Sequence, residues 1–404
     1  MKLAIVSDLH IGYERFEEDA YNQAREALFA ASEEADVILI PGDVFDKRSP
    51  KPDVIAQAIN IFRDVSRKQW KARVVDFKSS NGNKAYTDIP IIAIPGTHER
   101  VAEGKENVLR LLALAGLVVD ASESQVTVEL NGERVAVFGL GGVSEERVRE
   151  ILQRLDPKPV SGVFNIFMMH QSVYELLPFS GDTIRYDELP KGFDLYINGH
   201  IHSMVEATVH DKKFLIPGST VLTQLKDNEQ DPKGFILFDT KDYSHKFRPI
   251  NSRKFVVVDA RIDGASPKLV TKRCEEEIEK VLAQHKNRPI VRIKLHGSIA
   301  SGFTNIDMPL KSIVSKYSQK AIVEIDSSKL KSIESESGIK NLQEGSIGGM
   351  SIKELGMTTF LAKLRESKVD GDFDAQHLFE ILSSDQNKEK KLKSALELLN
   401  EAEK

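Results

Sequence analysis

Two histidines in the segment Asn-Gly-His-Ile-His, His200 and His202, have the residue type and spacing of a metal site. They follow an apolar run at residues 193–197, which is typical of a buried strand. Side chains alternate faces along a strand, so both imidazoles leave the same side, roughly 6 to 7 Å apart at the backbone. The ions of a two-metal hydrolytic site lie about 3.5 to 4 Å apart, so one histidine can serve each ion. A lone His-x-His pair is a weak signal of a metal site, so the residues at the other predicted strand ends must show whether one is present.

Further metal-competent side chains follow other apolar runs. Asp8-Leu9-His10 comes after residues 2–7, and Pro-Gly-Asp43 comes after residues 37–40. His98 follows the run at 91–94, and His170 ends the run at 163–169. Five of the ten histidines of the chain therefore stand at predicted strand ends. The candidate set is Asp8, His10, Asp43, His98, His170, His200 and His202.

These side chains offer nitrogen and oxygen donors and no sulfur, which suits Mn, Fe or Zn in an open hydrolytic site. A carboxylate such as Asp43 can bridge two cations, which a single imidazole cannot do. A pair of cations clamps a phosphate, makes hydroxide available near neutral pH and stabilises charge on the leaving oxygen. His98 could then act as the acid. The alternative for each motif alone is a structural role, with the aspartates capping turns.

Composition limits the protein class. A chain of 404 residues with 41% hydrophobic and 29% charged residues is long enough for two or three globular domains. No stretch approaches the ~20 apolar residues of a membrane span, so we expect neither a signal peptide nor an anchor. Cys274 is the only cysteine, which excludes an internal disulfide and fits the reducing cytoplasm. A net charge of -5 argues against nonspecific coating of nucleic acid but allows a local basic face.

The elements that must position these residues alternate between strands and helices, which predicts an α/β domain at residues 1–254. Helices are expected at 19–31, 53–65, 107–115 and 144–155, and strands at 125–130 and 135–138 are joined by an Asn-Gly hairpin turn. The apolar stripes of helices 53–65 and 107–115 can serve core packing or a dimer face. Residues 66–88 are a basic loop with the only tryptophan, either a solvated excursion or a phosphate-contacting arm.

The pattern changes after residue 254. Strands at 255–262, 290–295 and 321–325 alternate with helices at 267–285 and 307–317, which predicts a small α/β domain at 255–326. Residues 327–351 are rich in Ser, Gly, Lys and Glu and are expected to be a linker. Residues 352–404 are helical in pattern and rich in large apolar side chains, so this segment either binds a partner or folds back on the small domain.

The motifs together resemble a known family. Asp8-Leu9-His10, Gly42-Asp43, Gly96-Thr97-His98-Glu99, His170 and Gly199-His200-Ile201-His202 are similar, in their order, to the five signature blocks of calcineurin-like metallophosphoesterases. More narrowly, residues 1–13, 42–45 and 96–100 resemble the archaeal Mre-eleven, or SbcD-type, DNA break-repair nucleases. The resemblance implies a four-layer α/β core, a β-sandwich flanked by helices, with a smaller α/β capping domain and a C-terminal helical segment.

The same resemblance implies an activity and partners. It implies a 3'-5' exonuclease and single-strand endonuclease that acts on DNA ends with two Mn2+ per chain, with Mg2+, Fe or Zn2+ as alternatives. The protein would form a homodimer through helices 53–65 and 107–115. Its partner would be a Rad-fifty (SbcC-type) ATPase, bound through residues 352–404.

Roles for the site residues also follow from the resemblance. Asp8, His10, Asp43 and His202 would hold one metal, and Asp43, His170 and His200 the other, with Asp43 bridging. His98 would stabilise the transition state or protonate the leaving oxygen. The predicted DNA contacts are Lys71, Arg73 and Arg100.

Two positions depart from the family pattern. Thr97 stands where the family usually has an asparagine ligand of the second metal, and its hydroxyl is a poorer donor. Asp46 stands where some relatives carry a further histidine, and a carboxylate cannot replace a cationic acid. Two other functions therefore stay open: a phosphodiesterase for small substrates, or mainly a scaffold for the ATPase with weak nuclease activity.

Overall fold

The computed structural model describes residues 1–79, 89–101, 105–178, 181 and 183–332, and in the C-terminal part residues 356–357, 360–361, 374–383, 390–391 and 393–395. The chain divides into two compact units. Unit 1 comprises Met1–Val257, Lys280–Arg292 and Tyr317–Glu324, and unit 2 comprises Val258–Glu279, Ile293–Lys316 and Ile325–Lys404.

The first sheet of unit 1 has the strand order β13-β12-β1-β2-β4-β5. Strands β1, β2, β4 and β5 run parallel, and β12 pairs antiparallel with both β1 and β13. The strands are β1 (Lys2–Ile5), β2 (Val37–Pro41), β4 (Ile91–Ile94), β5 (Val119–Asp120), β12 (Gly234–Asp239) and β13 (Ser244–Pro249).

Three helices cover one face of this sheet: α1 (Glu17–Glu34), α2 (Pro52–Ser66) and α3 (Val108–Leu114). Small residues of α1, such as Ala24 and Ala27, pack with Ala4 of β1 in one buried cluster that also contains Phe62 of α2 and Leu109 of α3. The apolar stripes of α2 and α3 are therefore largely used in the core.

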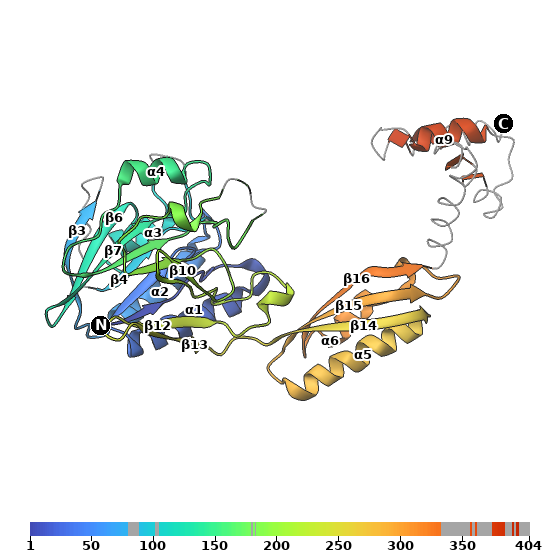
Figure 1. The fold of residues 1–404 in the computed structure, drawn as a ribbon. Coiled ribbons are helices and arrows are strands. Elements are labelled where there is room, and N and C mark those ends of the chain that lie inside the picture. The colour runs from blue at the N-terminus through green and yellow to red at the C-terminus, as the bar shows by residue number, and fades with distance from the viewer. Residues whose placement is uncertain are drawn as a thin grey trace. The chain divides into compact units, whose positions relative to one another are not determined.

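The second sheet has the order β10-β11-β9-β8-β7-β6-β3, and helix α4 (Val148–Leu155) packs on its outer face (Figure 1). Strands β7, β8 and β9 are parallel to one another. The strands are β3 (Arg73–Ser79), β6 (Ser124–Leu130), β7 (Glu133–Leu140), β8 (Phe164–Met169), β9 (Leu195–Asn198), β10 (Val205–Val209) and β11 (Lys212–Ile216).

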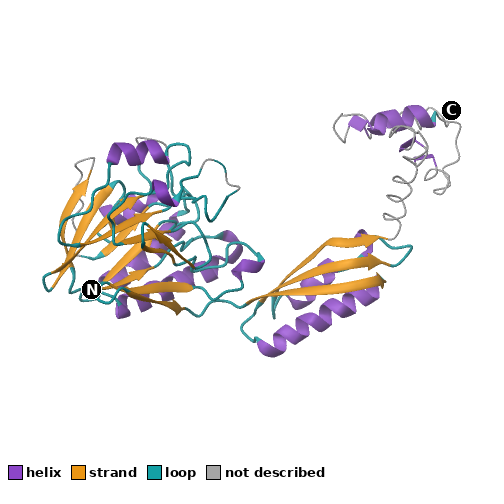
Figure 2. Ribbon diagram, in the orientation of Figure 1, coloured by secondary structure: helices purple, strands orange, loops and turns teal. Residues whose placement is uncertain are grey.

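The two sheets face each other across an apolar layer. Leu3 and Ile5 of β1 point into this layer and pack with Val137 of β7 and Ile166 of β8, whereas Ala4 points to the helices. Alternation along a strand buried on both faces explains why β1 and β8 read as continuous apolar runs. The result is a helix, sheet, sheet, helix arrangement, and the predicted four-layer fold class is confirmed (Figure 2).

A third, smaller sheet has the order β14-β15-β16. Its strands are β14 (Phe255–Ala265), β15 (Ile290–Ile299) and β16 (Ile322–Ser332), and the intervening helices are α5 (Pro267–Gln284) and α6 (Leu310–Tyr317). This is the alternation expected for the small α/β domain. Helix α9 (Ala375–Ser383) coincides with the helix predicted near 375–382, and most of the remaining C-terminal segment lies outside the described residues.

Two predictions of local structure were wrong. Residues 73–79 of the expected basic loop form β3, which pairs antiparallel with β6, because Val74 and Phe77 can pack against the sandwich. The linker was predicted to begin at residue 327, but strand β16 continues to Ser332, so the predicted start is too early. The Asn131-Gly132 hairpin is confirmed, with both residues at positive φ (52° and 84°) between β6 and β7.

Within the described residues, no helix is long and apolar enough to cross a membrane.

Candidate metal centre

The loops after β1 and β2 run side by side and fix the first three candidate ligands. The backbone N–H of Asp8 donates to the carbonyl of Gly42 (3.2 Å), and that of His10 donates to the carbonyl of Asp43 (3.1 Å). Parallel strands end at the same edge of a sheet, so residues 33 and 34 positions apart in the sequence become neighbours. The third parallel strand, β4, brings His98 to the same edge, where its N–H donates to Asp43 Oδ1 (2.9 Å).

Four of the candidate ligands have a left-handed backbone. The φ angles are 52° at Asp8, 45° at His10, 51° at Asp43 and 73° at His200. This region costs a residue with a side chain about 1–2 kcal/mol, and such strain persists only where the surrounding structure holds it. The tight turns direct these side chains back over the strand ends, toward one another.

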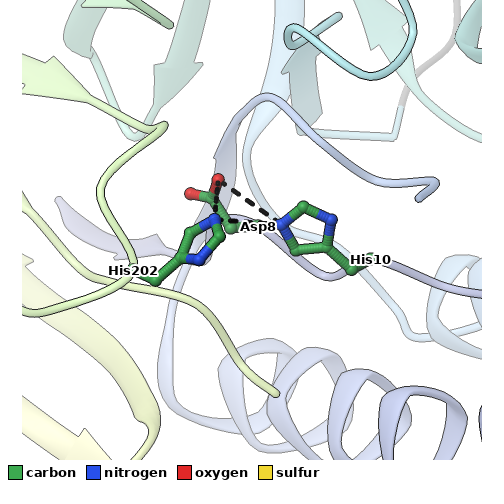
Figure 3. Close-up of side chains that lie close together, drawn as sticks. All are labelled: Asp8, His10 and His202. Atoms are coloured by element: carbon green, nitrogen blue, oxygen red, sulfur yellow. Dashed lines mark hydrogen bonds and ion pairs between the residues drawn. The ribbon is translucent and has the colours of Figure 1, made fainter. Parts of the chain in front are cut away.

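The first cluster contains Asp8, His10 and His202, whose side chains converge from two different loops (Figure 3). The Nε2 atoms of the two histidines are 3.2 Å apart. Asp8 Oδ1 lies 3.9 Å from His10 Nε2 and 3.7 Å from His202 Nε2. Asp8 and His10 are fully buried, and His202 is 18% exposed. Three donor atoms thus surround one point at the end of β1.

The second cluster contains Asp8, Asp43 and His170, so Asp8 is common to both clusters. Asp43 Oδ2 is 3.2 Å from His170 Nε2, and the Nδ1–H of His170 donates to the carbonyl of Pro41 (2.7 Å). That hydrogen bond assigns the proton to Nδ1 and turns Nε2 toward the carboxylate.

His200 lies next to the second cluster without belonging to it. Its ring centroid is 5.3 Å from that of His170. Its Nδ1 is 3.4 Å from Thr97 Oγ1, and its Nε2 is 3.0 Å from Ser172 Oγ. The structure therefore brings Thr97 and His200 together, as the family resemblance implies.

A third cluster contains His10, Asp46 and His98. Asp46 Oδ1 is 3.3 Å from His10 Nδ1 and 3.8 Å from His98 Nδ1. The Nδ1–H of His98 also donates to the backbone carbonyl of Asp46. The His98 side chain is 43% exposed, so it stands at the mouth of the site while the other histidines lie deeper.

The pKa values reflect this crowding. Burial raises the pKa of Asp8. Burial also acts to raise the pKa of Asp43, but the neighbouring His170 outweighs it and holds that pKa below its usual range. Burial opposes charge on His170 as well, yet Asp43 and Asp8 raise its pKa to about 9. Burial lowers the pKa of His200 to about 4 and lowers that of His202, so both are neutral at pH 7 and suited to bind a cation.

The residues fit a divalent cation. Two buried carboxylates, Asp8 and Asp43, share the site with imidazoles, and this donor set is the one that Mn, Fe or Zn takes in open sites. Among the described residues, buried His170 Nε2 and His10 Nδ1 have no hydrogen-bond partner of acceptable geometry. A buried polar atom without such a partner costs free energy, which a bound cation at His170 Nε2 would remove.

Glu99 belongs to the motif Gly96-Thr97-His98-Glu99, but the sequence predicted no role for it. It is fully buried and accepts hydrogen bonds from the N–H groups of Phe45 (2.9 Å) and Gly96 (2.8 Å). Burial, together with the charge of Asp43, raises its pKa to about 8. Glu99 thus ties the turn after β4 to the loop after β2. Its place in that motif, directly after His98, was the sequence signal for it.

Other supporting side chains were also missed. Thr223 Oγ1 is hydrogen bonded to His202 Nδ1, and Glu229 Oε1 lies 3.8 Å from the same nitrogen. Ser172 contacts both His200 and Glu145. Thr223 and Glu229 lie more than 20 residues after His202 in the chain and form no motif with it, so only the fold could reveal them.

The predicted DNA contacts are not gathered around this centre. Lys71 lines a cavity with Met1 and Lys2, at the start of β1, whereas the metal centre lies beyond the end of that strand. Arg73 begins β3 and is paired in register with Glu129. Arg100 lies two residues after His98, where its N–H closes a turn with the carbonyl of Thr97. Of the three, Arg100 is the one beside the site, and DNA contact by each of them stays a prediction.

Comparisons with known proteins found similar sequences and a similar solved structure. The family model of calcineurin-like phosphoesterases matches residues 1–204. The DNA double-strand break repair protein Mre11 of Sulfolobus acidocaldarius is 27% identical over 316 residues, which cover 74% of this chain and 76% of that protein. The double-strand break repair protein MRE11 of Arabidopsis thaliana is 26% identical over 373 residues, 76% of this chain and 51% of that protein. A solved archaeal phosphodiesterase covers 62% of this chain and 100% of its own, with 15% identity and a TM-score of 0.29.

Proposed function

Since the chain belongs to the calcineurin-like phosphoesterase family and is a metal-dependent phosphodiesterase, we propose that its substrate is DNA and that it processes the ends of double-strand breaks. The observation that carries the proposal is the pair of adjoining clusters around Asp8, in a chain similar to Mre11 proteins over about three quarters of its length. The chain spans about half the length of the Arabidopsis relative, so partners of that longer protein are not transferred from it.

We assign the ligands to two Mn2+ ions, with Mg2+, Fe or Zn2+ as alternatives. Asp8, His10, Asp43 and His202 would hold one ion, and Asp43, His170 and His200 would hold the other, with Thr97 as a weak additional donor. Bound cations would supply hydroxide near neutral pH and neutralise charge on the phosphate. The shared position of Asp8 between the clusters makes it a second bridging candidate beside Asp43.

His98 is proposed to protonate the leaving oxygen or to stabilise the transition state. Its Nδ1 is occupied by the carbonyl of Asp46, which leaves Nε2 as the atom for the substrate. Its 43% exposure places it where a phosphodiester can approach. The other histidines of the centre are less exposed, with His10 and His170 buried and His202 18% exposed, and each is assigned as a metal ligand.

The finer assignments are proposals that follow from the family resemblance. They are 3'-5' exonuclease and single-strand endonuclease activity, a homodimer formed through α2 and α3, and a Rad-fifty (SbcC-type) ATPase bound through residues 352–404. Most of that C-terminal segment lies outside the described residues. A location in the cytoplasm also stays an expectation.

A nuclease assay with purified full-length protein tests the function. With Mn2+ supplied, we expect cleavage of double-stranded DNA ends and of single-stranded DNA, and much slower turnover of a mononucleotide diester. His98→Ala should lose cleavage by 10²-fold or more, the usual contribution of a general acid, while it still binds DNA. Cleavage by His98→Ala at the wild-type rate would contradict the role of His98. Turnover of the small diester with no cutting of DNA would instead support the small-substrate phosphodiesterase.

A further inference from the structure

We propose that Thr223 and Glu229 are positioning residues that hold the His202 imidazole in the tautomer protonated on Nδ1, so that Nε2 offers its lone pair to a cation. This inference rests on the proposed function only in that the ligand of Nε2 is taken to be a metal. The tautomer itself is a property of the metal-free protein.

The direction of the hydrogen bonds around Thr223 assigns the proton. The Thr223 hydroxyl donates to Glu229 Oε1 at 3.2 Å, and it is also hydrogen bonded to His202 Nδ1. A hydroxyl has one proton to donate and two lone pairs to accept with. Because its proton is used on the carboxylate, the hydroxyl accepts the proton of His202 Nδ1. The chain of donors therefore runs from His202 through Thr223 to Glu229.

Glu229 is the final acceptor in this series of hydrogen bonds. It is 4% exposed, and besides Thr223 it receives the N–H of Gln224 (2.6 Å) and the ammonium of Lys233 (3.5 Å). Each of these groups donates to Glu229, so its carboxylate oxygens are the acceptors at the end of the chain. Its Oε1 is also 3.8 Å from His202 Nδ1, where a negative charge favours an N–H over a lone pair.

Lys233 fixes the backbone of the same histidine. The lysine is 5% exposed, and its ammonium donates to the carbonyl of His202 (2.9 Å) and to Ser219 Oγ (3.0 Å). The paired Glu229 and Lys233 therefore hold His202 from two sides, one through the ring and one through the main chain.

The loop that carries Thr223 is itself anchored in unit 1. The Tyr13 hydroxyl donates to the carbonyl of Thr223 (2.5 Å), and the Arg292 guanidinium donates to the carbonyl of Leu225. Apolar side chains of the loop join a buried cluster that comprises Phe16, Ala20, Val221, Leu222, Leu225, Phe255 and Ile290. A hydroxyl held this firmly gives the ring one preferred orientation, as the outer partners of metal-bound histidines generally do.

The opposite side of the ring is the metal centre. His202 Nε2 faces His10 Nε2 at 3.2 Å and Asp8 Oδ1 at 3.7 Å. Protonation on Nδ1 leaves this nitrogen without a hydrogen, which is the form that binds a cation. The opposite tautomer would place an N–H in the cluster and leave the Thr223 hydroxyl without a donor from the ring.

The first test reads the tautomer directly. Nitrogen-15 NMR of histidine-labelled, metal-free, full-length protein distinguishes protonated from unprotonated ring nitrogens, and a His202→Asn variant identifies the His202 signals. We expect a proton on Nδ1 and none on Nε2 in the wild type and in Thr223→Ser, and loss of this preference in Thr223→Val. A wild-type ring protonated on Nε2, or an unchanged tautomer in Thr223→Val, would overturn the proposal. The wild-type measurement alone decides if Thr223→Val does not fold.

The second test measures affinity for Mn2+ alone. Loss of an outer partner of a metal-bound histidine typically costs 10- to 100-fold, so Thr223→Val should bind Mn2+ at least about 10-fold more weakly, and Glu229→Gln should show a smaller loss. Thr208→Val, on the exposed side of β10, is the matched control and should bind as the wild type does. Wild-type affinity in Thr223→Val refutes the positioning role. Protein that shows the predicted tautomer and affinities but cuts no DNA supports this inference while it refutes the proposed function.

Discussion

Asp43 is the residue on which the two halves of the centre depend. One of its oxygens accepts the N–H of His98, and the other faces His170 at 3.2 Å. Its backbone carbonyl receives the N–H of His10, so it also holds the loop of the first cluster. A change at Asp43 is therefore expected to affect both metal positions rather than one.

Substitution of Asp43 by Asn should remove most of the stabilisation by Mn2+. A ligand at 100 times its Kd stabilises the folded protein by about 2.7 kcal/mol, which raises Tm by several degrees. We expect this shift in the wild type and nearly none in Asp43→Asn, because the charge of the proposed bridging ligand is lost. Thermal unfolding with and without Mn2+ measures the shift within each variant, so a changed metal-free stability does not interfere. Asp187→Asn, at an exposed position, should keep the full shift, and a full shift in Asp43→Asn would contradict the assignment.

At the scale of elements, the centre depends on how closely the turns after β2 and β4 approach. A Cβ on Gly96 would lie 2.1 Å from Asp43 Oδ1 and 2.4 Å from Asp43 N. No side chain fits there. The glycine is needed for the contact between the turns.

Substitution of Gly96 by Ala should therefore destabilise the protein by about 1–3 kcal/mol and reduce the stabilisation by Mn2+, since the clash displaces Asp43. Denaturant unfolding with and without Mn2+ measures both effects. Gly116→Ala is the control: its Cβ meets nothing within 4 Å, so it adds only backbone strain and should respond to Mn2+ as the wild type does. Gly96→Ala with native stability and native response would show that the turns can separate freely.

Helix α5 supplies a prediction for unit 2. Cys274 lies on its buried face with Val270 and Ile278, and all three are fully buried. Burial raises the pKa of the Cys274 thiol to about 11. The thiol is therefore protonated at neutral pH and shielded from reagents.

Cys274 should not react with a disulfide reagent at pH 8 in native protein and should react at once in denaturant. Because the thiol ionises near its ordinary pKa when unfolded but only near 11 when folded, rising pH above about 9 favours the unfolded state. Thiol titration of the full chain against pH, with Cys274→Ala as the blank, measures this. Stoichiometric reaction of the native protein at pH 8 would contradict the burial.

At the scale of the whole molecule, the proposed homodimer needs an exposed apolar surface, and helix α3 offers one. Helix α3 buries Leu109 and Leu112 in the core but exposes Leu111 (47%) and Leu114 (65%). Residues three apart lie on the same face of a helix, so these two leucines form one exposed apolar pair. An exposed apolar pair suits a partner surface, and a second copy of the chain is the partner that the resemblance implies.

The double variant Leu111→Glu/Leu114→Glu should be monomeric, because two added charges on each face would be buried without partners at the interface. Light scattering during gel filtration gives the mass. Val75→Glu, at a valine of β3 that is 46% exposed, is the matched control and should remain a dimer. A wild-type monomer, or a dimer that survives the double variant, would exclude this face.

The sequence by itself predicted an α/β domain and the residue types of the candidate centre, and its resemblance to calcineurin-like metallophosphoesterases implied the four-layer fold. Apolar runs of strand length predicted the strands, and a polar residue at each end marked the candidate centre, because parallel strands deliver their carboxyl ends to one edge. The positions of Asp8, Asp43, His98, His170 and His200 at the ends of predicted strands are enough to predict that these side chains gather in one centre. That prediction does not require knowing which strands pair with each other.

Only the tertiary structure decided what surrounds those ligands. Thr223 and Glu229 reach His202 because β12 returns the chain to pair with β1, a contact between distant segments that leaves no local pattern. The strand β3 was hidden in a basic stretch, since one strand face meets the sheet sandwich and the other meets water. Local periodicity records which residues are buried, whereas the pairing of distant segments depends on the packing of the whole chain.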